Sequence, residues 1–258
     1  MIAYNCKRLC LLLSDRIYYW QVLSVELVKK KSVHFVSSGT DVQDDSQSVK
    51  AHVSYFKLFT LFIIGSLLGI VLEGIHCLYC YGHWETHVVS VWGLFCILYG
   101  MGAVIFYACH FAVRRRNRFV QFLCYCAVGF SLELLCGCLL EFGLNMRAWD
   151  YTGHFMNIRG HVSPQMTFMW GIIGIVFSLL LPYIEFVLHK IENSKTKIAC
   201  MVLTVFMAIN LSLTFCAFIR WKGRHFDVTP KTSLGTMIDE RYNDEYMSER
   251  FCEWRFLS

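Results

Sequence analysis

Residues 119–140 read FVQFLCYCAVGFSLELLCGCLL, an apolar run in which Glu133 is the single charged side chain. An α-helix needs about 20 consecutive apolar residues to cross roughly 30 Å of hydrocarbon. Comparable runs occupy residues 56–75, 88–113, 166–187 and 198–219. Because backbone polar groups cannot remain unpaired in lipid, each run is expected to be helical. The predicted fold class is therefore all-α, a polytopic integral membrane protein with about five transmembrane helices.

The composition also indicates a lipid environment. Of the 258 residues, 56% are hydrophobic and 17% are charged, whereas a soluble domain carries about 25% charged residues. The net charge is +5, but the basic residues cluster beside the apolar runs and form no stripe of the kind that binds nucleic acid. Most of the 13 cysteines lie inside apolar runs, where cysteine acts as a small hydrophobe. We therefore predict neither nucleic-acid binding nor a disulfide framework.

The positions of lysine and arginine predict the orientation. Residues 114–118 contain four arginines and residues 190–197 contain three lysines, whereas residues 76–87 contain neither type. Short cytoplasmic loops are enriched in both, so these two loops and the N-terminal segment are placed in the cytoplasm. Five spans would leave the C-terminus outside. The basic residues that follow the fifth run, Arg220, Lys222 and Arg224, oppose that count.

Three parts are predicted along the chain. Residues 1–51 form an N-terminal cytoplasmic segment with a flexible linker, residues 52–222 the transmembrane helical domain, and residues 223–258 a C-terminal tail. Residues 16–31 fit a basic amphipathic helix on the membrane surface or a solvated segment. The tail fits a short interfacial helix or a loosely ordered chain.

Glycines and acids recur at four-residue spacing, which places them on one face of a helix. The third run carries Gly129, Glu133, Gly137 and Glu141, and the first carries Gly65, Gly69 and Glu73. Small residues let a neighbouring helix approach closely, so the carboxylates are expected to point into the bundle. Glu133 lies near mid-span, where charge is costly and typical of an ion or substrate path. The alternative is a structural hydrogen bond to another helix, for example to Asn210.

A weak internal repeat accompanies these stripes. Residues 69–73 resemble residues 137–141, each block precedes a Trp–acid pair at 84–85 or 149–150, and each leads to a Trp-Gly pair at 92–93 or 170–171. Two parallel helix–loop–helix units would follow, and transporters often bind their substrate between such repeats. The alternative is chance matching among residues common in membranes.

The loop after the first run contains His76, Cys77, Cys80 and His83, with His87 nearby. Two cysteines and two histidines could complete a tetrahedral zinc site, but the loop fits equally a Cys77–Cys80 disulfide or two free thiols. The pattern is short and solitary, so no metal is predicted. The chain also contains no G-x-x-x-x-G-K-[ST] phosphate loop, no G-x-S-x-G and no H-E-x-x-H. We therefore predict no enzyme activity, no cofactor and no ATP binding by that phosphate loop.

Several short motifs carry a family resemblance. They are L-E at 72–73, Y-G-M-G-A at 99–103, W-D-Y-T at 149–152, N-I-R-G at 157–160 and W-G at 170–171. Over roughly residues 54–220 the chain resembles a family of bacterial polytopic membrane proteins known as ABC-transporter permeases (CmpB-like, "type IV"). The family has prolines where Leu94 and Ile97 stand here, so the second helix is expected to be straighter. The resemblance marks as family-motif candidates Tyr99, Gly100, Trp149, Asp150, Tyr151, Asn157, Gly160, Trp170 and Gly171.

The sequence thus predicts a permease-like transport protein without its own ATPase, with Glu73, Glu133 and Glu141 as candidates for the transport path. One alternative is a non-transport scaffold or sensor that assembles through glycine-rich helix faces. Another is a membrane enzyme with an active site in the outer loop at 149–161. The expected partners are the lipid bilayer, a separate ATPase subunit and further copies of the chain. The expected location is the plasma membrane, which the chain crosses several times.

Overall fold

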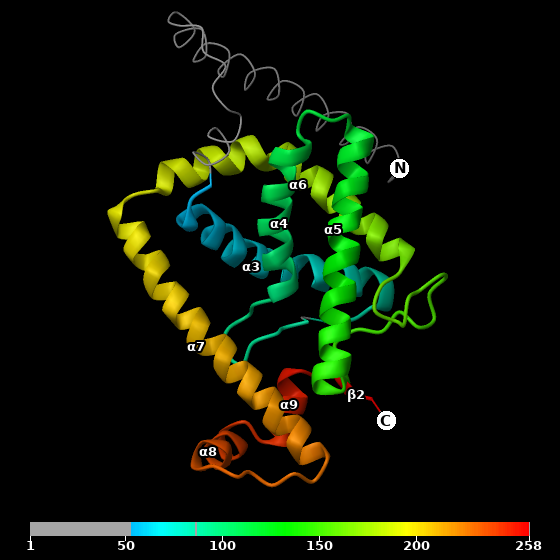
Figure 1. The fold of residues 1–258 in the computed structure, drawn as a ribbon, viewed down its shortest axis with the longest axis vertical. Helices are drawn as coiled ribbons and strands as arrows, with labels where there is room; N and C mark the ends of the chain where they lie inside the picture. The colour runs from blue at the N-terminus through cyan, green and yellow to red at the C-terminus, as the bar shows by residue number, and fades with distance from the viewer. Residues whose placement is uncertain (1–52, 86, 258) are drawn as a thin grey trace, which may run out of the picture. The chain divides into compact units, whose positions relative to one another are not determined.

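A computed structural model describes residues 53–85 and 87–257. The predicted N-terminal segment and linker lie outside these residues. Figure 1 shows a largely helical chain. The long helices are α3 (Tyr55–Tyr81), α5 (Arg118–Leu139), α6 (Pro164–Ile191) and α7 (Ser194–His225). A π-helical turn, η1 (Leu140–Leu144), continues α5.

Within the described residues, four helices are long and apolar enough to cross a membrane, namely α3, α5 with η1, α6 and α7. The remaining apolar helix, α4 (Ile97–Val113), has 17 residues. The all-α membrane fold class is therefore confirmed. The other elements are two short helices, α8 (Ser233–Arg241) and α9 (Asp244–Arg250), and a two-stranded antiparallel sheet of β1 (Met146–Arg147) and β2 (Arg255–Phe256).

Polar caps fix where the long helices begin. The side chains of Ser54, Asn117, Ser163 and Asn193 accept hydrogen bonds from backbone N–H groups in the first turns of α3, α5, α6 and α7. Such caps satisfy donors that have no partner within a helix. Helix α3 ends at Gly82, whose φ of 77° is the left-handed conformation that glycine adopts without steric cost. These caps place the helix starts within four residues of the predicted edges of the runs. Helix α3 continues six residues past its predicted end at residue 75, so His76, Cys77 and Cys80, which were expected in a loop, lie on the helix.

Glycines bring the helices together in two pairs. In the α3–α4 pair, Gly65 and Gly69 lie directly against Ala103 and Tyr99. In the α5–α6 pair, Gly129 lies directly against Trp170. A Cβ at any of these glycines would collide with the neighbouring helix. The predicted small-residue faces therefore pack inside the chain.

The second apolar run is only partly helical, which corrects the prediction of one helix over residues 88–113. Helix α4 begins at Ile97, and residues 88–96 form an irregular segment. At Gly93 the φ angle is 73°, which turns the backbone away from a helical path. Leu94 therefore lies outside the helix, and the expectation of a straighter helix through this position is wrong.

The irregular segment 88–96 is tolerated because other parts of the chain bind its backbone groups. Asn210 of α7 accepts a hydrogen bond from the N–H of Trp92 at 3.1 Å and donates one to its carbonyl at 2.8 Å. The hydroxyl of Thr214 accepts one from Val91 N–H. Tyr246 of α9 donates to the Val91 carbonyl. Irregular backbone at membrane depth requires partners of this kind.

The C-terminal residues are folded and contact both α7 and the irregular segment. Figure 1 shows α8 and α9 beside the carboxyl-terminal half of α7. The aromatic rings of Phe218, Phe251 and Trp254 contact one another, with Phe218 stacked on Trp254, in a hydrophobic cluster that also contains Met146 and Val91. The side chain of Arg250 donates to the carbonyls of Ser90 and Gly93. Residues 223–257 thus include two helices and a strand that cover one end of the bundle.

Pairing inside this C-terminal region explains the basic residues that follow the fifth run. Arg220 and Arg224 of α7 both form ion pairs with Asp239 of α8, and Arg224 also pairs with Asp244. Burial alone would raise the pKa of Asp239, but hydrogen bonds from the two guanidinium groups outweigh it and hold that pKa below its usual value. The two arginines therefore have a structural role in a folded region. Their positive charge is weaker evidence that the end of α7 lies in the cytoplasm.

The ion pairs of Asp239 lead to a prediction about acid stability. A carboxylate with a lowered pKa in the folded state stabilises the fold above its unfolded pKa, which is about 4. That contribution is lost as the pH falls through the folded pKa. We expect Asp239→Asn to unfold at a lower temperature than the natural chain at pH 7, with the difference shrinking as the pH falls below about 4. Thermal unfolding in detergent between neutral and acidic pH measures both; a difference that does not change with pH would contradict the assignment.

Candidate functional site

A partly enclosed cavity of about 230 Å³ lies where the ends of α3, α5 and α6 meet the irregular segment 88–96. Its wall is largely apolar and aromatic, with two carboxylates, Glu73 and Glu133, among the lining residues. An apolar pocket with a few convergent polar groups is the usual form of a small-molecule site. The lining residues are Glu73, His87, Val89, Cys96, Ile97, Leu98, Tyr99, Met101, Glu133, Cys136, Leu139, Leu140, Ala148, Trp149, Tyr151, Met166, Trp170 and Trp254.

Glu133 of α5 is the most deeply buried carboxylate at the cavity, with 3% of its surface exposed. Its Oε1 accepts a hydrogen bond from the Trp170 indole at 3.0 Å and a longer one from the Tyr151 hydroxyl at 3.4 Å. Its Oε2 is buried and has no hydrogen-bond partner among the described residues. Asn210, the alternative structural partner considered for Glu133, instead binds the backbone of Trp92. One carboxylate oxygen of Glu133 therefore lacks a partner within the described part of the chain.

Glu73 of α3 is held in a similar way from the opposite wall. The Tyr99 hydroxyl donates to Glu73 Oε2, and Glu73 Oε1 lies 3.8 Å from His87 Nε2. The rings of Tyr99 and Trp170 stack with their centres 5.2 Å apart. Each carboxylate thus receives a hydrogen bond from an aromatic side chain of the paired helix, and the two aromatic donors stack on each other.

Glu141 binds residues of the loop between η1 and α6 and is not among the residues that line the cavity. It forms ion pairs with Arg147 and Arg159, and its Oε2 lies 2.8 Å from His161 Nε2. Burial lowers the pKa of His161, although the neighbouring Glu141 carboxylate opposes this shift. The hydrogen bond to the Glu141 carboxylate raises the pKa of Arg159. We infer that Glu141 stabilises the loop between η1 and α6.

The W-D-Y-T and N-x-x-G motifs fold into one compact turn of this loop. Asp150 binds the Thr152 backbone and the Arg147 guanidinium. Burial would raise the pKa of Asp150, but these hydrogen bonds outweigh it and lower that pKa. Asn157 donates to the Thr152 carbonyl and accepts from the Gly160 N–H. At Gly160 the φ angle is 74°, and a Cβ there would collide with Asp150.

This turn positions two aromatic residues at the cavity. Trp149 donates its indole N–H to the His161 carbonyl, and Tyr151 reaches Glu133. Of the residues predicted from the sequence, the structure brings together at the cavity Glu73, Tyr99, Glu133, Trp149, Tyr151 and Trp170. The others lie in supporting positions: Asp150, Asn157 and Gly160 in the turn, Glu141 in its ion pairs, and Gly100 and Gly171 at close helix contacts.

The sequence analysis did not identify two lining residues whose rings contain nitrogen, His87 and Trp254. His87 was noted only for its spacing after the cysteines, and Trp254 lies in the tail, for which no site was predicted. Cys77 and Cys80 are both free thiols, which excludes their disulfide in this structure. The third match of the internal repeat also fails, because Trp92-Gly93 precede α4 whereas Trp170-Gly171 lie inside α6.

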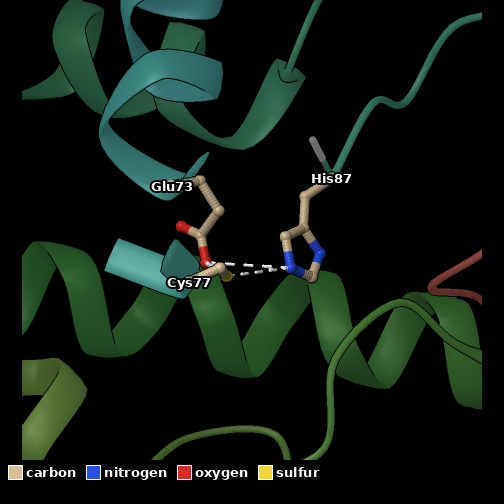
Figure 2. Close-up of side chains that lie close together, drawn as sticks. All are labelled: Glu73, Cys77 and His87. Carbon is tan, nitrogen blue, oxygen red and sulfur yellow. Dashed lines mark hydrogen bonds and ion pairs between the residues drawn. The ribbon is translucent and has the colours of Figure 1, made fainter. Parts of the chain in front are cut away.

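Cys77 and His87 lie next to Glu73 at the edge of the cavity. Figure 2 shows the three side chains converging, with Glu73 and Cys77 on α3 and His87 on the chain that leads to the irregular segment. Their ligand-type atoms all lie within 4.8 Å of one another. His87 has a φ of 43°, an uncommon conformation for a residue with a side chain. A carboxylate, a thiol and an imidazole together form a set of groups that metals bind.

A family model described as "Putative ABC-transporter type IV" matches residues 60–215, which contain every residue predicted from the motifs. No curated protein and no solved structure matches the chain.

Proposed function

Since the chain belongs to the ABC-transporter type IV family, we propose that it is a permease-like subunit that crosses the plasma membrane several times and binds its solute in the cavity beside Glu133. The family supports a role related to transport. The observation that carries the proposal is that Glu133 lines the cavity while its buried Oε2 has no hydrogen-bond partner among the described residues. A polar group inside a membrane domain is costly unless a ligand or a path uses it.

The charges around the cavity favour a positively charged solute. The lining residues include Glu73 and Glu133 but neither lysine nor arginine. Aromatic rings of Tyr99, Trp149 and Trp170 form much of the wall, and such rings attract cations, quaternary ammonium groups in particular. Drug-sized ligands occupy pockets of roughly 300–1,000 Å³, so a cavity of about 230 Å³ fits a smaller molecule. We therefore propose a small organic amine or ammonium ion.

Energy for transport is proposed to come from a separate ATPase subunit, since these 258 residues contain no phosphate-binding loop of the G-x-x-x-x-G-K-[ST] type. The exposed basic turns at 114–116 and 190–197 lie at the same end of the bundle. At this end Lys57 forms an ion pair with Glu185, and Arg118 donates a hydrogen bond to Ser178. The cavity lies toward the opposite ends of these helices. An ATPase on the basic end would contact the membrane domain without blocking the solute site.

The packing of the glycines weakens the scaffold alternative. Gly65, Gly69 and Gly129 contact helices of the same chain, so those faces are not free to join copies. The proposal also assigns no covalent chemistry to the site and thus no enzyme activity. The residues of the outer loop, including Asp150 and Asn157, bind each other and shape the turn.

A matched pair of small molecules tests the charge preference. We expect choline to bind the full chain in detergent and to change the fluorescence of the tryptophans at the cavity. Its neutral carbon isostere, 3,3-dimethylbutan-1-ol, has the same shape but no charge, and should bind much more weakly. Equal responses to both compounds, or no response to choline and to smaller ammonium ions, would contradict a site for cations.

A further inference from the structure

The strongest unassigned feature lies at the outer end of α3, where Glu73, Cys77 and His87 converge. Glu73 and Cys77 are four residues apart and so share a helix face. Cys77 Sγ lies 3.9 Å from Glu73 Oε1 and 4.0 Å from His87 Nε2, and the latter two atoms are 3.8 Å apart. Figure 2 shows the three side chains directed at one point. Cys77 is 1% exposed, so the group is sheltered from bulk solvent.

A fourth donor lies beside this group. Glu85 Oε2 is 3.0 Å from His87 Nε2 and 3.6 Å from Cys77 Sγ. The set therefore offers one thiol, one imidazole and two carboxylates, drawn from α3 and from the loop after it. Tetrahedral zinc sites take four ligands of these types.

The spacing matches a zinc coordination sphere. With bonds of about 2.0–2.1 Å to nitrogen and oxygen and about 2.3 Å to sulfur, tetrahedral geometry places ligand atoms roughly 3.3–3.6 Å apart. The separations that involve Cys77 Sγ or His87 Nε2 run from 3.0 to 4.0 Å. Cys77 Sγ and His87 Nε2 thus lie near tetrahedral spacing from each other and from one oxygen of each carboxylate.

Neighbouring groups orient two of the four donors. The Tyr99 hydroxyl holds the second oxygen of Glu73, and His83 Nε2 lies 2.7 Å from the second oxygen of Glu85. Ligands of bound metals are commonly fixed by such outer hydrogen bonds. The two carboxylates are thus directed with one oxygen toward the cluster and the other toward a partner.

We propose that Glu73, Cys77, Glu85 and His87 bind a zinc ion. The thiol and the imidazole disfavour Mg²⁺ and Ca²⁺, which prefer oxygen ligands. On binding, the Cys77 thiol releases its proton to solvent as its sulfur bonds to the ion. The ion would join the end of α3 to the loop before the irregular segment and fix the part of the cavity wall made by Glu73 and His87. The inference is independent of the proposed transport function, because it is tested without solute.

Cobalt provides the test, since Co²⁺ replaces Zn²⁺ and its absorption reports tetrahedral thiolate coordination. The full chain, purified in detergent without a histidine tag and treated with a chelator, is titrated with Co²⁺ and then with Zn²⁺. We expect one Co²⁺ per chain, an intense visible band with a sulfur-to-cobalt band in the near ultraviolet, and displacement of both by Zn²⁺. Absence of these bands in the natural chain would overturn the proposal without recourse to any variant.

Variants of the two neighbouring cysteines locate the ion. Cys77→Ser should lose the sulfur band and bind Zn²⁺ more weakly by roughly 100-fold or more, because loss of an outer-shell partner alone costs about 10- to 100-fold. Cys80→Ser is the matched control, since Cys80 is exposed and contacts His76 outside the cluster; it should behave like the natural chain. Bands that persist in Cys77→Ser, or that disappear in Cys80→Ser, would place the metal elsewhere and overturn the assignment.

Discussion

Replacement of Glu133 by glutamine is expected to abolish most solute binding while leaving the fold intact. Glutamine keeps the size of the side chain and an oxygen that can accept from the Trp170 indole, but it removes the negative charge at the Oε2 position. A hydrogen bond to a charged group contributes about 1.5–3 kcal/mol, which corresponds to a loss of roughly 10- to 150-fold in affinity. Uptake of choline into proteoliposomes that contain the complete transporter should fall accordingly.

Two measurements keep this result interpretable. Thermal unfolding of Glu133→Gln in detergent should stay close to that of the natural chain, because the replaced oxygen has no partner among the described residues. Glu240→Gln is the matched control, since Glu240 is an exposed carboxylate in α8. The proposed role of Glu133 is wrong if its variant binds choline as tightly as the Glu240 variant does.

Replacement of Asn210 by leucine should strongly destabilise the protein. The Asn210 side chain is fully buried and supplies partners for both the N–H and the carbonyl of Trp92. Leucine has similar size but offers neither a donor nor an acceptor. Each buried polar group left without a partner costs about 1–3 kcal/mol, so the two together cost about 2–6 kcal/mol. Folded proteins are stable by only about 5–15 kcal/mol.

The effect of Asn210→Leu is measured by the amount of monodisperse protein extracted from membranes and by its unfolding temperature. Ile209→Leu is the matched control, because Ile209 precedes Asn210 on α7 and is exposed on the surface of the bundle. The natural chain and the control should unfold together, well above Asn210→Leu. If all three unfold together, the Asn210 hydrogen bonds contribute little and the irregular segment must be stabilised in another way.

The long helices could be predicted from the sequence because the requirement that lipid imposes is local. Each of α3, α5, α6 and α7 carries its own apolar run, and its backbone groups bind one another. The same reasoning failed for residues 88–96, since their partners Asn210 and Arg250 lie 118 and 160 residues further along the chain. Hydropathy carries no information about such distant hydrogen bonds.

The candidate site was predictable to a similar extent. The spacing of acids and glycines identified Glu73 and Glu133 as inward-facing, and the family motifs identified Tyr99 and Trp170 beside them. The resemblance could not show that the two aromatic donors stack on each other. It also could not place His87 next to Cys77 and Glu73, because that arrangement depends on how the loop folds back after α3.

The bonds between α9 and the irregular segment have a consequence for biogenesis. Tyr246 and Arg250 bind backbone groups of Val91 and Ser90, 155 and 160 positions earlier in the chain. A ribosome synthesises Ser90 and Val91 long before Tyr246 and Arg250 exist. The translocon must therefore release or shelter the segment 88–96 while these carbonyls still lack hydrogen-bond donors. The cavity beside Glu133, whose wall includes Trp254, is therefore completed only after the last helices have been synthesised.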